Sequence, residues 1–125
     1  MSDERDPLTA AVIGAAMEAH REFGPGLLES VYQKCLAWEL RARKIECHPQ
    51  HRLPLTYKGE VIDEDFILDF YFPGKLVVEI KAVEKLLPIH EAQLLTYLRL
   101  SRTRVGLLVN FNVPLLKDGL KRMVY

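Results

Sequence analysis

The segment from residue 69 to residue 81 constrains the fold more than any other part of the chain. It reads DFYFPGKLVVEIK and predicts two antiparallel strands joined by a tight turn at Pro-Gly-Lys. Side chains two residues apart on a strand point to the same face, so Glu79 and Lys81 share a face. Charged groups in so apolar a strand must be compensated by each other, by a metal ion or by water in a cleft.

The loop length of this hairpin decides whether Asp69 joins the charged face. Directly opposed residues share a face, so Asp69 lies beside Glu79 only if the paired residue numbers have an even sum. A three-residue loop, residues 73–75, meets this condition. The hydrophobic pattern predicts the same register, because it gathers apolar side chains of both strands on one face. These side chains are Phe66, Leu68, Phe70, Phe72, Leu76, Val78 and Ile80. The opposite face then holds Ile67, Asp69, Tyr71, Val77, Glu79 and Lys81.

The composition is that of one globular domain, residues 1–125. Apolar residues make up 49% and charged residues 27%, and no apolar run approaches the roughly 20 residues that span a bilayer. The acidic start lacks the basic and apolar regions of a signal peptide, so we expect a cytoplasmic protein without a membrane segment. Cys35 and Cys47 lack disulfide-framework spacing and are expected to be reduced. Since 17 basic residues balance 17 acidic ones, the basic footprint of a strong general nucleic-acid binder is missing.

A first helix is expected to begin at Asp6 and Pro7, because Asp is a good cap and Pro is tolerated at the first helical position. Gly24 is expected to end it. His20 lies at the margin of the apolar stripe, where a partly buried, hydrogen-bonded histidine and a site residue are equally good interpretations. The stripe consists of Leu8, Val12, Ala15, Ala19 and Phe23.

A second helix is expected from residue 27 to about residue 43. At 100° per residue, Glu29 points almost the same way as Leu36 and Leu40, which places an acid on the core side of the first turn. A carboxylate there is stabilised by the positive end of the helix by roughly 0.3 to 1 kcal/mol, so Glu29 is either a helix-terminal acid or a site residue. The apolar face consists of Leu28, Tyr32, Cys35, Leu36 and Leu40.

The rest of the chain predicts alternating strands and one helix. Strands are expected at residues 45–48, 52–58, 66–72, 76–82 and 105–111, a helix from Pro88 to about Ser101, and a further edge strand at residues 120–124. In that helix His90, Gln93 and Tyr97 share a face, which is either part of a site or a solvated polar face. The order helix, helix, three or four strands, helix, strand predicts an α/β fold with a central mixed β-sheet flanked by helices.

Asp69, the ten-residue step to Glu79, then Lys81 and a helix with Gln93 resemble the PD-(D/E)XK nuclease superfamily. A closer resemblance is to the small bacterial family of GxxExxY proteins, whose motif matches residues 26–32, GLLESVY. Further matching runs are HREFGP at 20–25, YKG at 57–59, VEIKA at 78–82, QLLTYL at 93–98 and GLLVNF at 106–111. The resemblance extends from about Leu8 to Met123.

The resemblance implies a restriction-endonuclease-like core and a nuclease that acts on DNA or RNA. Asp69, Glu79 and the carbonyl of Ile80 would bind Mg²⁺ or Mn²⁺, which are hard cations that prefer oxygen ligands. Glu29 would be the acid from the preceding helix, bonded to a metal water or a second ion. Carboxylates that converge in an apolar cleft would repel one another and raise their pKa values unless a cation enters.

The same resemblance implies roles for the neighbouring polar residues. Lys81 would orient or deprotonate the attacking water, and Gln93 would help to position Lys81 or the phosphate. Candidate substrate-binding residues are Tyr32, Tyr97 and His20. The alternative is a non-cleaving module that binds nucleic acid or protein and retains the nuclease fold. A homodimer is a further expectation, because one small neutral domain offers little surface for gripping a duplex.

Overall fold

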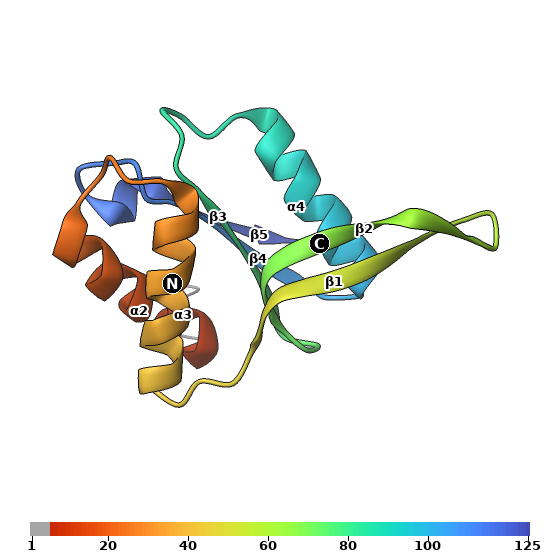
Figure 1. Ribbon diagram of the computed structural model, residues 1–125, viewed down its shortest axis with the longest axis horizontal. Coiled ribbons are helices and arrows are strands. Elements are labelled where there is room, and N and C mark those ends of the chain that lie inside the picture. The colour runs from red at the N-terminus through yellow and green to blue at the C-terminus, as the bar shows by residue number, and fades with distance from the viewer. Residues whose placement is uncertain (1–5) are drawn as a thin grey trace.

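Five strands form one mixed sheet in the computed structural model, which describes residues 6–125 (Figure 1). Their order is β1-β2-β3-β4-β5, with β3 and β4 parallel and the other neighbours antiparallel. The elements in chain order are α2 (Pro7–Phe23), α3 (Glu29–Ala42), β1 (His48–Tyr57), β2 (Glu60–Phe72), β3 (Leu76–Lys81), α4 (Pro88–Ser101), β4 (Val105–Asn110), η1 (Leu116–Gly119) and β5 (Leu120–Val124). The predicted α/β fold with a central mixed sheet is confirmed.

The helices cover the two faces of the sheet unequally (Figure 1). Helices α2 and α3 pack on one face and enclose the larger core, whereas α4 packs alone on the other face over a smaller core. Val78 and Ile80 of β3 enter the larger core and Val77 enters the smaller one, as alternation along a strand requires. Strand β4 contributes to both cores, which explains its almost wholly apolar sequence. Within residues 6–125, no helix is both long enough and apolar enough to cross a bilayer.

The predicted ends of α2 are confirmed. The Asp6 carboxylate accepts a hydrogen bond from the Thr9 N–H at 3.3 Å, and Gly24 ends the helix with φ of 65°. The expectation that Phe23 and Leu28 belong to the buried stripes was wrong, because both side chains are exposed. They flank the turn between α2 and α3, where the apolar period in the sequence runs past the packed part of each helix.

The even register of the β2–β3 hairpin is confirmed, since Phe70 pairs with Val78 and Phe72 with Leu76. Of the two arguments for that register, the one from loop length was right and the one from hydrophobic pattern was wrong in part. Phe66 and Leu68 pack in the α4 core, whereas Phe70 and Phe72 pack in the α2–α3 core. The side-chain alternation of β2 is therefore broken at Asp69.

Strand β1 also differs from the prediction, because residues 48–57 form one continuous strand instead of two short ones. Gln50, which lies opposite Asp69 in the register, has a positive φ of 52°. The β1–β2 hairpin continues well beyond β3, which pairs with β2 only at residues 70–72. We call its outer part, residues 52–65, the arm; it projects from the body on the right of Figure 1.

Candidate active site

Two carboxylates lie side by side where β2 and β3 separate. Beyond the Phe70–Val78 pair, the N–H of Asp69 donates to Oε2 of Glu79 at 3.0 Å, and the N–H of Ile80 donates to Oδ2 of Asp69 at 2.8 Å. These hydrogen bonds to side chains connect the two strands beyond the point where their backbone pairing ends. The sequence prediction that Asp69 and Glu79 meet is confirmed.

Burial sets the electrostatics of this pair. Glu79 is only 5% exposed, and its desolvation, followed by the negative charge of Asp69, raises its pKa well above the ordinary value of 4.5. Burial also raises the pKa of Asp69, although the hydrogen bond from Ile80 and the Lys81 ammonium oppose the rise. Burial disfavours the anionic form of both acids, and each anion repels the other. A divalent cation bound between them would offset both effects.

Lys81 and Gln93 form the adjacent part of the site. The Lys81 ammonium nitrogen Nζ donates to Oε1 of Gln93 at 3.4 Å, which connects the end of β3 to α4. Tyr97, one turn further along α4, is buried with its ring 5.3 Å from the Phe66 ring. Desolvation raises the pKa of the Tyr97 phenol, and the negative charges of Glu79 and Asp69 add to the rise.

His90 does not join its two helix neighbours at the site. Its Nδ1 accepts a hydrogen bond from the Leu87 N–H at 3.0 Å and so caps the start of α4. The polar face predicted for this helix therefore divides between the site, which takes Gln93 and Tyr97, and the helix terminus.

Glu29 stands at the rim. It is the first residue of α3 and is exposed, so the expectation that it points to the core was wrong. Partial burial still raises its pKa, which the charge of Lys81 opposes and that of Asp69 reinforces. Within residues 6–125, no three His, Cys, Asp or Glu side chains converge closely enough to hold a metal ion. Glu29 therefore leaves the buried pair as two carboxylates, with no third acid in the cluster.

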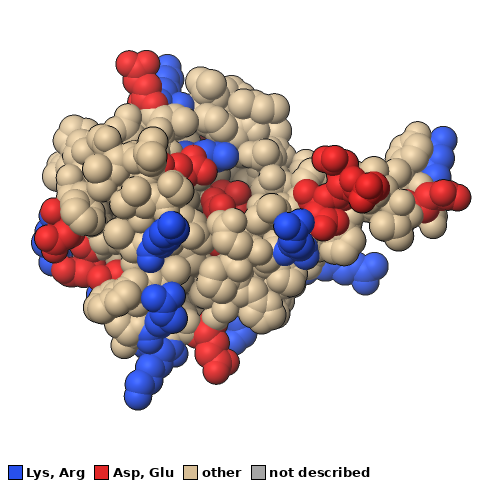
Figure 2. Space-filling view, in the orientation of Figure 1, with Lys and Arg blue, Asp and Glu red and all other residues tan. Residues whose placement is uncertain are grey.

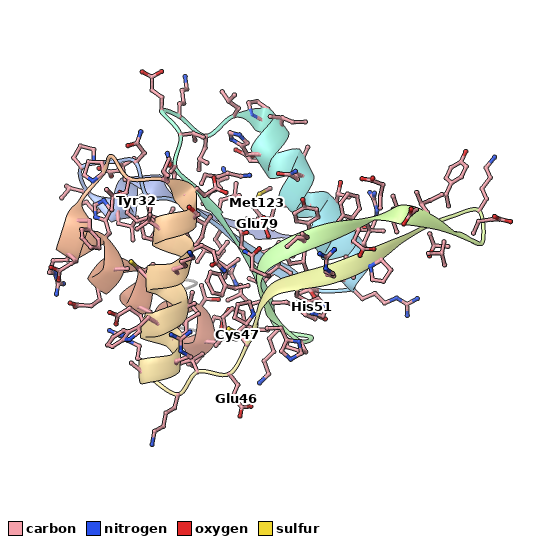
Figure 3. The ribbon with its side chains drawn as sticks, viewed as in Figure 1. Tyr32, Glu46, Cys47, His51, Glu79 and Met123 are labelled. Carbon is pink, nitrogen blue, oxygen red and sulfur yellow. The ribbon has the colours of Figure 1, made fainter. Side chains whose placement is uncertain are left out.

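The site opens toward the viewer of Figures 2 and 3. In Figure 3, Glu79 lies at the centre of the molecule, between α3 and α4. In the same orientation, Figure 2 shows acidic atoms in a hollow at the centre of the body, with basic side chains beside it. Glu79 itself is nearly buried and Asp69 is partly buried.

Two glutamines that the sequence did not single out support Asp69. Nε2 of Gln33 donates to the Asp69 carbonyl at 3.3 Å, and a side-chain hydrogen bond from Gln50 opposes the rise in the pKa of Asp69. Gln33 follows Glu29 by one helical turn, so helical spacing could have found it. Gln50 reaches Asp69 from a strand position with positive φ, for which the sequence pattern carried no signal.

Tyr32 and His20 hold the surrounding framework. Tyr32 is fully buried and stacks on Phe111 with 4.6 Å between ring centroids, and its hydroxyl donates to the Gly24 carbonyl and accepts from the Leu27 N–H. His20 bonds through Nε2 to the Val113 carbonyl at 2.8 Å. Of the two interpretations of His20, the buried hydrogen-bonded histidine describes its position, and Tyr32 lies well apart from Glu79 in Figure 3.

The mixed sheet, its flanking helices and the acid pair beside a lysine define an α/β fold of the restriction-endonuclease-like type. A family model of the PD-(D/E)XK nuclease superfamily matches residues 6–123. The chain therefore belongs to the PD-(D/E)XK nuclease superfamily. Searches of curated proteins and of solved structures found no match.

Proposed function

We propose that this protein is a Mg²⁺- or Mn²⁺-dependent nuclease that hydrolyses phosphodiester bonds in DNA or RNA. The observation that carries the proposal is the pair of buried carboxylates, Asp69 and Glu79, beside the Lys81 ammonium. An ion-pair cluster that served stability alone would balance its charges, whereas this one has two acids of raised pKa and one cation.

The donor set suits a hard divalent cation. Asp69 and Glu79 each use one oxygen to accept a backbone N–H, which fixes the carboxylate and leaves a second oxygen as a donor. The N–H and C=O of one strand residue point to the same side, so the Ile80 carbonyl is directed toward β2, as its N–H is. We assign the ion to these three groups, with Glu29 as an additional acid at the rim. When bound, such an ion activates water and stabilises charge on the phosphate.

The remaining residues orient the reactants. The Lys81 ammonium orients the attacking water and offsets the charge that develops on the phosphate oxygens. Gln93 holds Nζ of Lys81 in place through its amide oxygen. A tyrosine phenol is protonated near neutral pH, and the raised pKa of Tyr97 extends that state, so Tyr97 can donate a hydrogen bond into the site. We do not extend substrate binding to Tyr32 and His20, whose polar groups are engaged within the framework.

We also infer that the chain is a GxxExxY protein within the superfamily. The glycine of the motif, Gly26, donates its N–H to Oδ1 of Asn112 at 3.1 Å, and its tyrosine, Tyr32, bonds to the turn before α3. The glutamate, Glu29, is left to face Lys81 and Asp69. The glycine and tyrosine of the motif would then serve to position its glutamate at the rim.

A second candidate is a non-cleaving module that binds nucleic acid or protein. Two observations favour it: the formal net charge is zero, and the part of the chain that the structure describes brings together only two acids closely. A cleavage assay decides between the two candidates. It uses single- and double-stranded DNA and RNA with Mg²⁺ or Mn²⁺, and compares the parent chain with Asp69→Asn and Lys81→Ala.

Exposed residues provide matched controls, Glu22→Gln for the acid and Lys85→Ala for the lysine. Cleavage that is lost in the two site variants and kept in the two controls supports the nuclease. Equal cleavage by Asp69→Asn and the parent would place the chemistry elsewhere. If no substrate is cut although calorimetry detects Mg²⁺ binding that Asp69→Asn abolishes, the non-cleaving module is the better description.

A further inference from the structure

The arm, residues 52–65, lies outside both hydrophobic cores. Leu53, Leu55 and Ile62 are only partly buried, and no apolar residue of the arm belongs to either core. Near the tip, Tyr57 is 61% exposed and Val61 77% exposed. A two-stranded hairpin alone is marginally stable in water, so an arm with uncovered apolar side chains is expected to have a partner.

The charge of the arm favours a basic partner over a phosphate backbone. It carries four carboxylates, Glu60, Asp63, Glu64 and Asp65, and two cations. Both cations are engaged within the arm: Arg52 lies 3.4 Å from Asp65, and the Lys58 ammonium lies 5.4 Å from the centre of the Tyr57 ring. Within residues 6–125, the other three acids form no ion pair. Figure 2 shows acidic atoms gathered along the arm.

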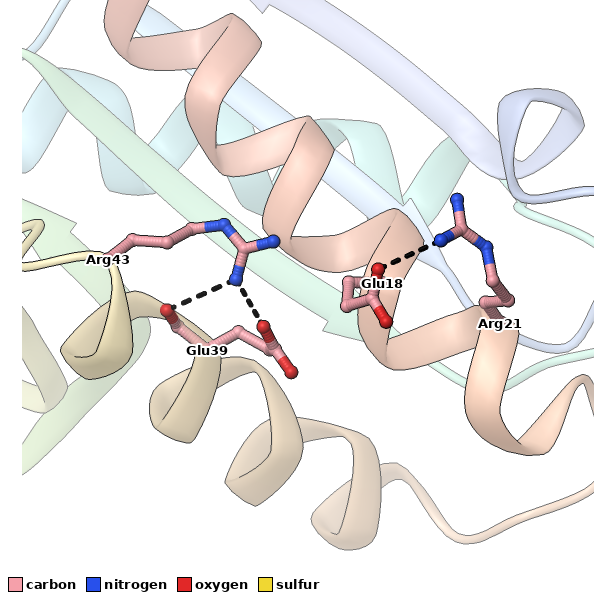
Figure 4. Close-up of polar contacts among 4 residues, drawn as sticks. All are labelled: Glu18, Arg21, Glu39 and Arg43. Carbon is pink, nitrogen blue, oxygen red and sulfur yellow. Dashed lines mark hydrogen bonds and ion pairs between the residues drawn. The ribbon is translucent and has the colours of Figure 1, made fainter.

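A basic groove lies at the other end of β1, with a volume of about 1110 Å³. Its cations are Arg41, Lys44 and Lys75 against one acid, Glu46, and its apolar lining includes Leu8, Leu40, Ile45 and Phe72. In the described part of the chain, these three cations have no ion-pair partner. By contrast, Figure 4 shows that Arg43, which follows Arg41 at the end of α3, is bound to Glu39. The groove therefore presents positive charge around an apolar floor, which complements the arm.

The position of the two features on one strand decides which basic partner fits. His48 and Pro49, at the start of β1, line the groove, and the rest of β1 runs from Arg52 to Tyr57 into the arm. In Figure 3, Glu46 and Cys47 mark the groove side, and the arm extends away from them. A two-fold axis near the middle of β1 would bring each arm to the groove of a second copy. Such an exchange is closed, because both contacts are equivalent.

The free edge of β1 is poorly suited to a different kind of contact, the direct addition of a strand. Pro49 and Pro54 have no N–H to donate, and the register shifts between Pro54 and Leu55. Side chains, and not backbone pairing, must then make the contact. We propose that this chain forms a two-fold symmetric dimer in which the acidic arm of each copy lies in the basic groove of the other.

Sedimentation velocity of the full chain, without nucleic acid or metal, tests the dimer. The parent protein should sediment as a dimer at about 0.1 M NaCl. Its dissociation constant should rise at least about tenfold at about 1 M NaCl, where the Debye length falls from about 10 Å to about 3 Å. A parent protein that is monomeric at low salt, whatever its nuclease activity, overturns the proposal.

Charge reversal tests the interface itself. The groove variant Arg41→Glu/Lys75→Glu and the arm variant Asp63→Lys/Glu64→Lys change exposed residues, and each alone should be monomeric. Mixing the two should restore dimers, because both contacts of the mixed pair are then complementary. The control Arg99→Glu/Lys121→Glu reverses exposed charges outside the groove and should dimerise like the parent. Circular dichroism checks that each variant is folded; failure of the mixture to dimerise, or dimers that persist in both reversed variants, overturns the proposal.

Discussion

Two groups of carboxylates in the domain have opposite environments. On the helix surfaces, Glu18 lies 2.9 Å from Arg21 and Glu39 is bound to Arg43, so each acid has a cation three or four residues further along its own helix or at its end (Figure 4). At the site, Asp69 and Glu79 come from two strands and face each other. The cation beside them, Lys81, is bonded to an amide oxygen.

The difference separates charges that contribute to folding from charges that oppose it. A surface pair at this spacing adds a few tenths of a kcal/mol to the stability of the fold. The buried pair is disfavoured as two anions, which is why the pKa of Glu79 is raised. A protein that retains such a pair gives up stability for a site, as sites that bind cations commonly do.

Glu79→Gln should change activity and stability in opposite directions. An amide oxygen can still accept the Asp69 N–H, so the fold is kept, but one anionic ligand is lost. The rate of cleavage in Mg²⁺ should fall by more than about 100-fold. Loss of a residue that only hydrogen-bonds to a metal ligand already lowers metal affinity or activity by about 10- to 100-fold. The free energy of unfolding of the metal-free protein should rise by about 1 to 3 kcal/mol at pH 7, because a desolvated charge is removed. Urea unfolding in a chelator measures the second effect.

Glu39→Gln is the matched control for both measurements, because it neutralises a carboxylate that has its own arginine. It should leave cleavage unchanged and should not stabilise the fold. If Glu79→Gln instead destabilises the metal-free protein, the acid is part of a stabilising network, and the contrast between the two kinds of carboxylate is wrong.

The sequence predicted the part of the site that depends on local rules. Strand alternation and a three-residue loop place Asp69 beside Glu79, and helical spacing puts Gln93 and Tyr97 on one face. Neither rule contains the break in alternation at Asp69, which sends Leu68 to the opposite core from Phe70. The break lies where the pairing of β2 with β3 ends, opposite Gln50 of β1. The sequence pattern does not predict the positive φ of Gln50.

The arm was underestimated for a related reason. Residues 60–65 pair only with β1 and pack in neither core, so their sequence, EVIDED, has no regular apolar period. Glu29 shows the opposite error, because its angular position matched that of buried residues although the helix begins at Glu29 itself. Periodicity predicts burial only where an element is packed along its whole length.

Gln93→Ala should lower kcat by about 10- to 100-fold with little change in KM, as expected for a residue that positions a catalytic group. The change removes the amide oxygen that lies 3.4 Å from Nζ of Lys81. Because Gln93 is exposed, the free energy of unfolding should change by less than about 0.5 kcal/mol. Gln93→Asn keeps the amide on a shorter side chain, so its kcat should lie between those of the parent and Gln93→Ala. A loss of stability equal to the loss of activity would assign Gln93 a structural role instead.

The stability advantage of Glu79→Gln should depend on pH. The folded-state pKa of Glu79 is raised above 4.5, so the folded protein binds more protons than the unfolded chain above that pH. Stability from this group is therefore complete below pH 4.5 and is lost as the pH rises through the folded-state pKa. The difference in the free energy of unfolding between Glu79→Gln and the parent, both in chelator, should be small near pH 4 and should widen toward pH 8, by on the order of 1.4 kcal/mol per unit of pKa shift.

Mg²⁺ should reduce the difference in stability between Glu79→Gln and the parent, because the parent gains a bound cation that the variant holds weakly. The gain in the parent should be larger at pH 8 than at pH 5, where protons compete with the ion. A difference that is constant from pH 4 to pH 8 would mean that Glu79 ionises freely in the folded protein, which would remove the electrostatic argument for a cation.

The smallest effect is expected at the surface pairs. Glu18→Gln should lower the free energy of unfolding by about 0.2 to 0.5 kcal/mol, because it removes an exposed pair between neighbouring helical residues. The loss should disappear at about 1 M NaCl, where exposed charges are screened, whereas the effect of Glu79→Gln should persist because the buried pair is screened much less. Chemical unfolding in urea at the two salt concentrations measures both. If salt reduces the two effects equally, Asp69 and Glu79 are as well solvated as the surface acids. The site would then hold no uncompensated negative charge for a cation to neutralise.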